Sequence, residues 1–331
     1  MPARYAINAA LIVAFIIAGS IIMSSGLLSR AQSTIIIQVG IYIMLAVSLN
    51  IVTGYLGQLP LGHAGFMAVG AYTGAIFWKS GLLTGMPDVA AGLVIAGISA
   101  AIVGILIGIP ALRLRGDYLA IITLGFGEII RVTLINLTPV TGGTQGLQSI
   151  PRHTNFILVY ICVAITCTVI HMIMKSRHGR AILAIRENEI AAESCGVKTT
   201  YYKVMAFAVS AFFAGVAGAL YAGTLGILVP NAFDFMASIN ILVMVVLGGM
   251  GSMLGSVIAA SILTSLPLAL QALNEYRLII YALLLIGVMI FKPTGLMGTY
   301  DFSLSFVLER LGAGALRRKK EKEKGGQSDG S

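Results

Sequence analysis

The stretch KSRHGRAILAIRENEIAAESCGVKTTYYK, residues 175–203, lies between two long apolar segments and carries six Lys or Arg residues and three Glu residues. Residues 179–194 have the mixed polarity of a helix that is only partly covered, and Gly196 follows where a C-terminal cap is expected. So many charges cannot lie in hydrocarbon. We therefore expect a short helix over 179–194 that lies in water or against a partner protein.

The rest of the chain is strongly apolar. Of its 331 residues, 57% are hydrophobic and only 11% are charged, whereas ordinary soluble domains are about 25% charged. Most of the protein surface must therefore face lipid. The net charge of +9 is concentrated in a few segments, so no nucleic-acid partner is expected. The apolar run 5–23 is longer than the core of a signal peptide, and we interpret it as a retained anchor.

Apolar runs long enough to cross a bilayer divide the chain into spans. A tract at 235–273 is interrupted by glycines at 248–252, and the last run, 278–291, is short. A break at these glycines gives ten spans and places both termini on one side. The seven clear runs before this tract are 5–28, 34–52, 59–78, 89–109, 118–137, 154–174 and 204–228.

The distribution of basic residues favours ten spans with both termini in the cytoplasm. That topology places 17 Lys and Arg residues inside and four outside, as the positive-inside rule predicts. We therefore expect an all-α polytopic membrane protein with about ten transmembrane helices. One transmembrane domain would cover 1–300, with 175–203 as a cytoplasmic segment between spans six and seven. Residues 301–331 would form a basic cytoplasmic tail, and its distal part would be disordered.

The run from Asn50 to Phe66 contains Pro60 and four glycines, more helix breakers than packing requires. Non-helical backbone at membrane depth survives only where protein or a water-filled cavity satisfies it. This pattern indicates a discontinuous or re-entrant entry into the third span, and a tight helical hairpin turn at the interface is the alternative. His63 has no second ligand at metal spacing, so no metal site is expected.

The fifth predicted span contains Glu128 and Arg131, three residues apart on one helical face, a spacing that allows them to pair with each other. Ionisable residues inside a membrane are candidates for function, although a pair at the interface that reaches toward water is the alternative. The chain contains no GxxxxGK[ST] motif and no recognisable nucleophile with a base. We therefore expect neither an ATPase nor another enzyme.

Several separate motifs, taken in order, resemble the LivM-type permease of bacterial branched-chain amino-acid ABC transporters. The similarity covers most of the chain. The motifs are GYLGQLPLGHAGFMAVGAY at 54–72, LRGDYLAIITLGFGEIIR at 114–131, TGGTQGL at 141–147, GRAILAIRENEIAAESCGV at 179–197, VLGGMGSMLGS at 246–256 and KPTGLMG at 292–298.

This resemblance implies a type II-like ABC importer permease in the bacterial cytoplasmic (inner) membrane that translocates leucine, isoleucine and valine. It implies a sister permease subunit, two ABC ATPase subunits that bind ATP and Mg, and a soluble substrate-binding protein. This chain itself would bind no cofactor. The central charged helix would be the coupling helix that docks on an ATPase, through Arg186, Glu187, Glu189 and Glu193. Glu189 and Glu193 are like charges four residues apart, which a basic partner would relieve.

The same resemblance indicates a mostly apolar substrate path with a few polar groups. The candidates from the third and fifth spans are Gln58, His63, Thr123 and Glu128. Two alternatives remain open. One is an ABC permease of the same architecture for urea or short amides, and the other is an ion-coupled secondary transporter, against which the scarcity of intramembrane carboxylates argues.

Overall fold

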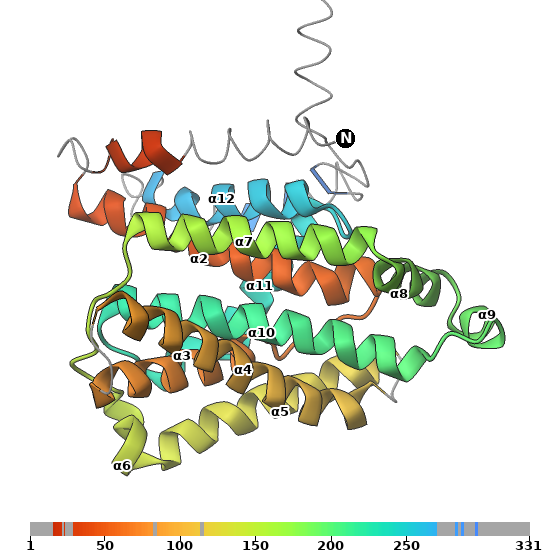
Figure 1. The fold of residues 1–331 in the computed structure, drawn as a ribbon, viewed down its shortest axis with the longest axis horizontal. Coiled ribbons are helices and arrows are strands. Elements are labelled where there is room, and N and C mark those ends of the chain that lie inside the picture. Colours follow the sequence, from red (N-terminus) through yellow and green to blue (C-terminus); the bar gives the residue numbers. More distant parts are fainter. Residues whose placement is uncertain are drawn as a thin grey trace, which may run out of the picture.

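The chain folds into a bundle of long helices that run side by side, as the computed structural model shows (Figure 1). The predicted all-α class is confirmed for the described part of the chain, where one isolated bridge between Leu147 and Leu228 is the whole β structure. The structure describes residues 16–21, 23, 29–81, 85–112, 116–269, 282–283, 286–287 and 295–296.

Long apolar helices alternate with shorter helices along the described part of the chain. Their bounds are α2 Arg30–Asn50, the π-helix η1 Ile51–Tyr55, α3 His63–Ser80, α4 Met86–Ala111, α5 Asp117–Asn136, α6 Thr138–Thr141, the 3₁₀ helix η2 Gly143–Gln145, α7 Phe156–Lys175, α8 Arg177–Glu187, α9 Glu189–Ser194, α10 Thr199–Leu225, the 3₁₀ helix η3 Pro230–Phe233, α11 Phe235–Gly248 and α12 Met253–Ala269.

Five helical segments in the described residues are long and apolar enough to cross a membrane. They correspond to five of the predicted spans and contain η1 joined to α2, together with α4, α5, α7 and α10. The predicted break at the glycines is also present, because α11 ends at Gly248 and α12 begins at Met253. Most of the first predicted span, most of the run 278–291 and all of the tail 301–331 lie outside the described residues. The count of ten spans, the side of the termini and the domain limits therefore stay predictions.

Glycines allow α3 and α10 to pack closely in the centre of the bundle. A Cβ atom added at Gly70 of α3 would meet the backbone of Gly215, and one added at Gly218 of α10 would meet the carbonyl oxygen of Met67. Such close backbone approach through small residues is the usual packing mode of membrane helices. It buries α10 deeply, with 67% of its most apolar window inside the protein.

Helix α3 begins inside the bundle. It follows the non-helical residues 56–62, and two contacts fix the depth at which it starts. His63 Nε2 lies 3.1 Å from Ser48 Oγ, and Ser48 is seven residues, or about 10 Å, from the end of η1. A Cβ atom at Gly62 would meet the backbone of Thr123, in the second turn of α5. The segment 56–62 therefore runs back into the bundle before α3 starts, which agrees with the predicted discontinuous entry.

A second connection, residues 226–234, enters the bundle from the opposite end. At that end Ile150 N donates to the Gly226 carbonyl at 3.1 Å. Further in, the hydroxyl of Tyr72, halfway along α3, donates to the Leu228 carbonyl at 3.1 Å. Helix α11 then starts at Phe235, with Asp234 as its N-cap, and ends near α8, since a Cβ atom at Gly251, just after α11, would lie 3.3 Å from Arg186 Nη1.

The prediction of one helix over 179–194 is wrong. The structure has two helices, α8 and α9, separated at Asn188. Asn188 is extended, and its side-chain oxygen accepts a hydrogen bond from Ala191 N at 3.0 Å, the geometry of an N-cap that starts a new helix. The predicted cap is confirmed, because Gly196 has φ +83° and its N–H donates to the Glu193 carbonyl.

Candidate functional site

The N-terminal turns of α3 and α11 meet inside the bundle. Ala64 N, in the first turn of α3, donates to Ser238 Oγ, in the first turn of α11, at 3.1 Å. Helix α5 forms the third wall beside them, and a small pocket of about 10 Å³, room for about one water molecule, lies between the three helices. Its lining residues are Leu61, Gly65, Leu124, Gly127, Glu128, Phe233, Asp234, Phe235 and Ser238.

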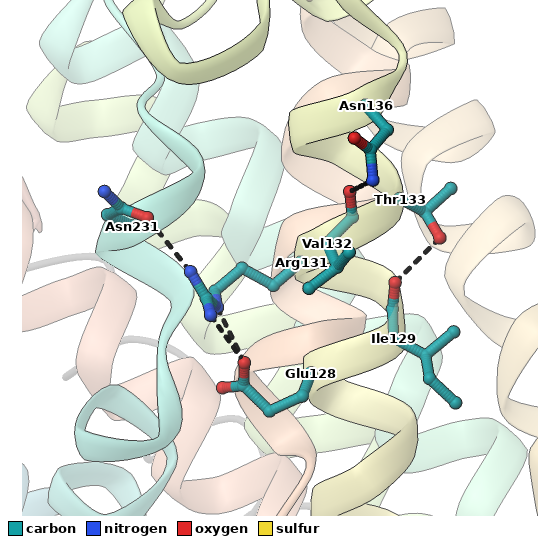
Figure 2. A network of polar contacts seen from close by, with 7 residues as sticks. All are labelled: Glu128, Ile129, Arg131, Val132, Thr133, Asn136 and Asn231. Carbon is teal, nitrogen blue, oxygen red and sulfur yellow. Dashed lines mark hydrogen bonds and ion pairs between the residues drawn. The ribbon is translucent and has the colours of Figure 1, made fainter.

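Glu128, which lines this pocket, is paired with a basic residue of the same helix. Glu128 Oε2 accepts hydrogen bonds from both Nε and Nη2 of Arg131, at 2.8 and 2.7 Å, which confirms the predicted pairing. Arg131 Nη1 also donates to Asn231 Oδ1 at 3.0 Å, so the pair joins α5 to the connection 226–234 (Figure 2). Glu128 Oε1 accepts no hydrogen bond from any residue that the structure describes.

Asp234 adds a second carboxylate to the pocket. Its Oδ1 accepts a hydrogen bond from Ala237 N at 2.8 Å and caps α11. Glu128 and Asp234 thus place two carboxylates in the pocket wall, and the guanidinium of Arg131 lies next to Glu128 without lining the pocket. The two helix N-termini add partial positive charge. Both signs of charge therefore lie close together beside an apolar lining.

The segment 56–62 is held against α5 by Thr123. Its hydroxyl accepts a hydrogen bond from Leu61 N at 3.0 Å and lies 2.8 Å from the Leu119 carbonyl, to which it donates. Leu61 lines the pocket, so Thr123 positions part of the wall without lining it.

Of the four predicted path residues, Glu128 alone lines this pocket. His63 is buried and contacts Ser48 rather than the pocket. Gln58 is half-buried in the segment 56–62, and its Oε1 has no hydrogen-bond partner in the described part of the chain. Sequence reasoning did not identify Asp234 or Ser238, although an Asp directly before an apolar run is a recognisable N-cap signal.

The charged segment places its predicted contact residues in different surroundings. Arg186 is exposed, yet its Nη1 donates to the Gly54 carbonyl of η1 at 2.8 Å. Glu187 and Glu193 are exposed. Glu189 instead forms an ion pair with Lys203 of α10 at 2.7 Å. The charge of Glu189 is thus neutralised by a residue of the same chain. From the sequence, a basic residue of a partner protein was expected in this role.

Comparison with known proteins identifies the family. Residues 32–289 match the family model described as the permease component of the branched-chain amino acid transport system. The chain belongs to this family of permeases. All the lining residues of the pocket, the π-helix η1 and the charged segment lie within the matched range.

Curated relatives of this branched-chain amino acid permease agree with that assignment. The high-affinity branched-chain amino acid transport system permease protein LivM of Escherichia coli is 38% identical over 308 residues, which cover 82% of this chain and 71% of that protein. LivM of Salmonella typhimurium is 37% identical with the same coverage. LivH of Escherichia coli is 27% identical over 281 residues, 78% of this chain and 91% of LivH. No solved structure is significantly similar to the chain.

The predicted resemblance is therefore confirmed. The chain is a multi-pass membrane permease of a branched-chain amino acid ABC transport family, and its homologues are permease subunits rather than enzymes. LivM and LivH carry the name of the same transport system, which implies that two related permeases serve it.

Proposed function

We propose that this chain is the transmembrane permease subunit of an ATP-driven ABC importer for leucine, isoleucine and valine. A periplasmic or extracellular binding protein would deliver the amino acid. The observation that supports this proposal is the pocket between α3, α5 and α11, because its lining combines apolar side chains with two carboxylates and two helix N-termini, and Arg131 lies next to one of the carboxylates. A branched-chain amino acid has the same combination, an aliphatic side chain on a zwitterionic head.

The arrangement of the pocket suggests how the head group would bind. The ammonium group would lie near Glu128 Oε1 and the Asp234 carboxylate. The carboxylate would lie toward the N-terminal turns of α3 and α11, whose partial positive charge favours anions. Leu61, Leu124 and Phe233 would face the aliphatic side chain. The apolar part of this lining matches an aliphatic side chain better than urea or a short amide. The pocket in this conformation has room for about one water molecule, so the amino acid would enter only after α3, α5 and α11 move apart.

The other predicted path residues have distinct proposed roles. Thr123 would hold the segment 56–62 in place, and the His63–Ser48 contact would fix the start of α3. Gln58 would offer a polar group along the entry to the pocket. These assignments rest on the contacts described above, together with the general rule that broken membrane helices surround substrate sites.

Helix α5 supports the proposal of a sister permease subunit. Its most apolar window is only 17% buried, and its mean hydropathy of 1.7 is the lowest of the five candidate spans. Half-exposed charges such as Glu128 and Arg131 are costly against lipid. A second, related permease that covers α5 would remove this cost and would place the pocket near the subunit interface.

The segment formed by α8 and α9 is the proposed contact with two ABC ATPase subunits, which would bind ATP and Mg. Arg186, Glu187 and Glu193 are exposed there, and Ile190 is 66% exposed between the two glutamates. An apolar side chain among charges is typical of a protein interface. This role requires the segment to be cytoplasmic, as expected for a type II-like permease with ten spans and cytoplasmic termini in the inner membrane.

The test is uptake of labelled leucine, isoleucine and valine into vesicles that contain the chain with its sister permease and ATPases, together with the binding protein. We expect uptake that requires ATP, resists an ionophore and is unaffected by excess urea or acetamide. Uptake without ATP that an ionophore abolishes would identify a secondary transporter. Competition by urea or acetamide would support the alternative substrate class.

One variant tests the pocket itself. Glu128→Gln removes the charge proposed to meet the ammonium group, so the KM for leucine should rise about tenfold, as for loss of one hydrogen bond to a charged group. Thr133→Val is the matched control, because Thr133 is exposed on another side of α5 and donates only to Ile129 O (Figure 2). An unchanged KM in Glu128→Gln would remove Glu128 from the substrate path.

A further inference from the structure

We propose that Arg186 is a positioning residue that transmits movement of α8 to the non-helical segment 56–62, and so to the pocket. The contact that carries this proposal is the hydrogen bond from Arg186 Nη1 to the Gly54 carbonyl, at 2.8 Å. The proposal deepens the proposed function, because it assumes that α8 is moved by an ATPase. It assigns Arg186 a task inside the permease in addition to any contact outside it.

The side chain of Arg186 binds the backbone at η1, where the regular α-helical hydrogen bonding of α2 ends. Gly54 lies in the π-helix η1, and single π turns are rare and are often found at functional sites. Directly after η1 the helix stops, and residues 56–62 lead to the start of α3. Arg186 thus binds the last helical turn before the break, the point from which a displacement passes into the non-helical segment.

The side chain of Arg186 fits between three glycines. A Cβ atom at Gly57 would lie 3.1 Å from Arg186 Cγ, and one at Gly251 would lie 3.3 Å from its Nη1. Both glycines have positive φ, +76° and +88°, which other residues rarely adopt. Gly251 belongs to the turn between α11 and α12, so the guanidinium group touches both helix breaks at this end of the bundle.

These two breaks are fastened to each other by Asn50. Its Oδ1 accepts a hydrogen bond from Gly251 N at 2.9 Å, and its Nδ2 donates to the Ser252 carbonyl at 3.0 Å. Asn50 is the last residue of α2 and is almost fully buried. Arg186 therefore lies on a hydrogen-bonded joint, where the start of segment 56–62 is held against the turn that follows α11.

Both paths from this joint lead to the pocket. Along one path, segment 56–62 ends at Leu61, whose N–H is bound by Thr123. Along the other, α11 leads back to Ser238, which is bonded to Ala64. Since Leu61 and Ser238 line the pocket, a shift of Arg186 would move two of its walls together. A continuous series of contacts of this kind can couple movement of α8 to the pocket, and only a functional measurement on variants can show that it does.

Another arginine of the same helix provides a matched control. Arg180 is also exposed on α8, but its Nη1 lies 3.5 Å from the carbonyl of Lys175, just before α8 itself. Among the described residues no contact joins Arg180 to η1, and Arg180→Gln removes the same charge from the same helix. A difference between the two variants therefore reports the contact with Gly54 rather than the charge of α8.

The experiment compares wild type, Arg186→Gln, Arg186→Lys and Arg180→Gln in the reconstituted complex. Two quantities are measured, leucine uptake per ATP hydrolysed and amide hydrogen exchange of residues 54–62. We expect Arg186→Gln to lower uptake per ATP about tenfold, as for loss of one charge-assisted hydrogen bond. We also expect faster exchange of 54–62. Arg186→Lys should restore part of both, because its ammonium group can still donate, and Arg180→Gln should match wild type.

Three results would overturn the proposal. In the first, Arg186→Gln changes neither quantity. In the second, uptake and hydrolysis fall in the same proportion with unchanged exchange of 54–62, which would make Arg186 a contact for the ATPase alone. In the third, Arg180→Gln gives the same losses as Arg186→Gln. A wild-type complex without ATP-dependent uptake would instead refute the proposed function, and this proposal with it, whereas the first three results leave the proposed function intact.

Discussion

The ion pair between Glu189 and Lys203 predicts an unequal response to removing either partner. The Lys203 side chain is only 4% exposed, whereas that of Glu189 is 26% exposed, and the two atoms lie 2.7 Å apart. The pair attaches α9 to α10. Glu189→Gln therefore leaves an ammonium group in an almost dry site, and Lys203→Met leaves a carboxylate that can turn toward water.

The size of each effect follows from this burial. Removing one partner of a buried ion pair costs about 3–5 kcal/mol. We expect about 3 kcal/mol for Glu189→Gln, because the pair is partly exposed and glutamine keeps an acceptor oxygen. For Lys203→Met we expect about 1 kcal/mol, close to the value of an exposed pair. The double variant should lie near wild type, since replacing both charges with neutral groups is often neutral.

Amide hydrogen exchange within α9 measures this local opening. Ala192 N and Cys195 N donate to the carbonyls of Asn188 and Ala191, so their exchange requires α9 to open. A cost of about 3 kcal/mol corresponds to roughly 150-fold faster exchange in Glu189→Gln. Glu193→Gln is the control, because Glu193 is exposed and no ion pair with it is found among the described residues. Equal effects in the two single variants, with an additive double variant, would refute the unequal burial of the pair.

Two further predictions concern stability and are checked by thermal unfolding of the purified protein in detergent. Gly218→Ala should destabilise the protein by about 1–3 kcal/mol because its Cβ would meet a carbonyl of α3. Gly125→Ala is the control: no described atom lies within 4 Å of its added Cβ, so it should be neutral or stabilise the protein by up to about 1 kcal/mol. Equal effects of the two variants would contradict the close packing of α3 against α10. Asn50→Ala should cost about 2 kcal/mol through two lost hydrogen bonds to the backbone at 251–252. Asn136→Ala, whose exposed amide binds only its own helix, should cost far less, and a similar loss would disprove the role of Asn50.

The parts of the fold that sequence could predict depend on local patterns. Apolar runs revealed five of the helices because hydropathy follows directly from composition along the chain. The glycine break before Met253 was predicted because splitting the tract into two spans places the basic C-terminal tail on the cytoplasmic side with most of the other Lys and Arg residues. Glu128 and Arg131 were paired correctly because their spacing of three residues places them on one helical face.

Other features depend on contacts that no local pattern reveals. The segment 179–194 looked like one helix because its residues have good helix propensity, but the side chain of Asn188 competes for the backbone and starts a second helix. In the sequence, Lys203 is only one of the six basic residues of the segment 175–203. In the structure it is buried, because α9 folds back over the first turns of α10 and supplies Glu189.

The meeting of α3 and α11 shows most clearly why breakers in a sequence do not define a site. Glycines and Pro60 indicate where a helix must stop, but not the depth at which the next one starts. Here α3 starts inside the bundle and runs away from α8, and α11 starts at the same place and runs toward it, so their N-termini face each other at the Ala64–Ser238 hydrogen bond (Figure 1). Each start leaves up to four N–H groups without helical partners. A continuous helix would leave none at this depth, so the two breaks together create a polar site in an otherwise apolar interior.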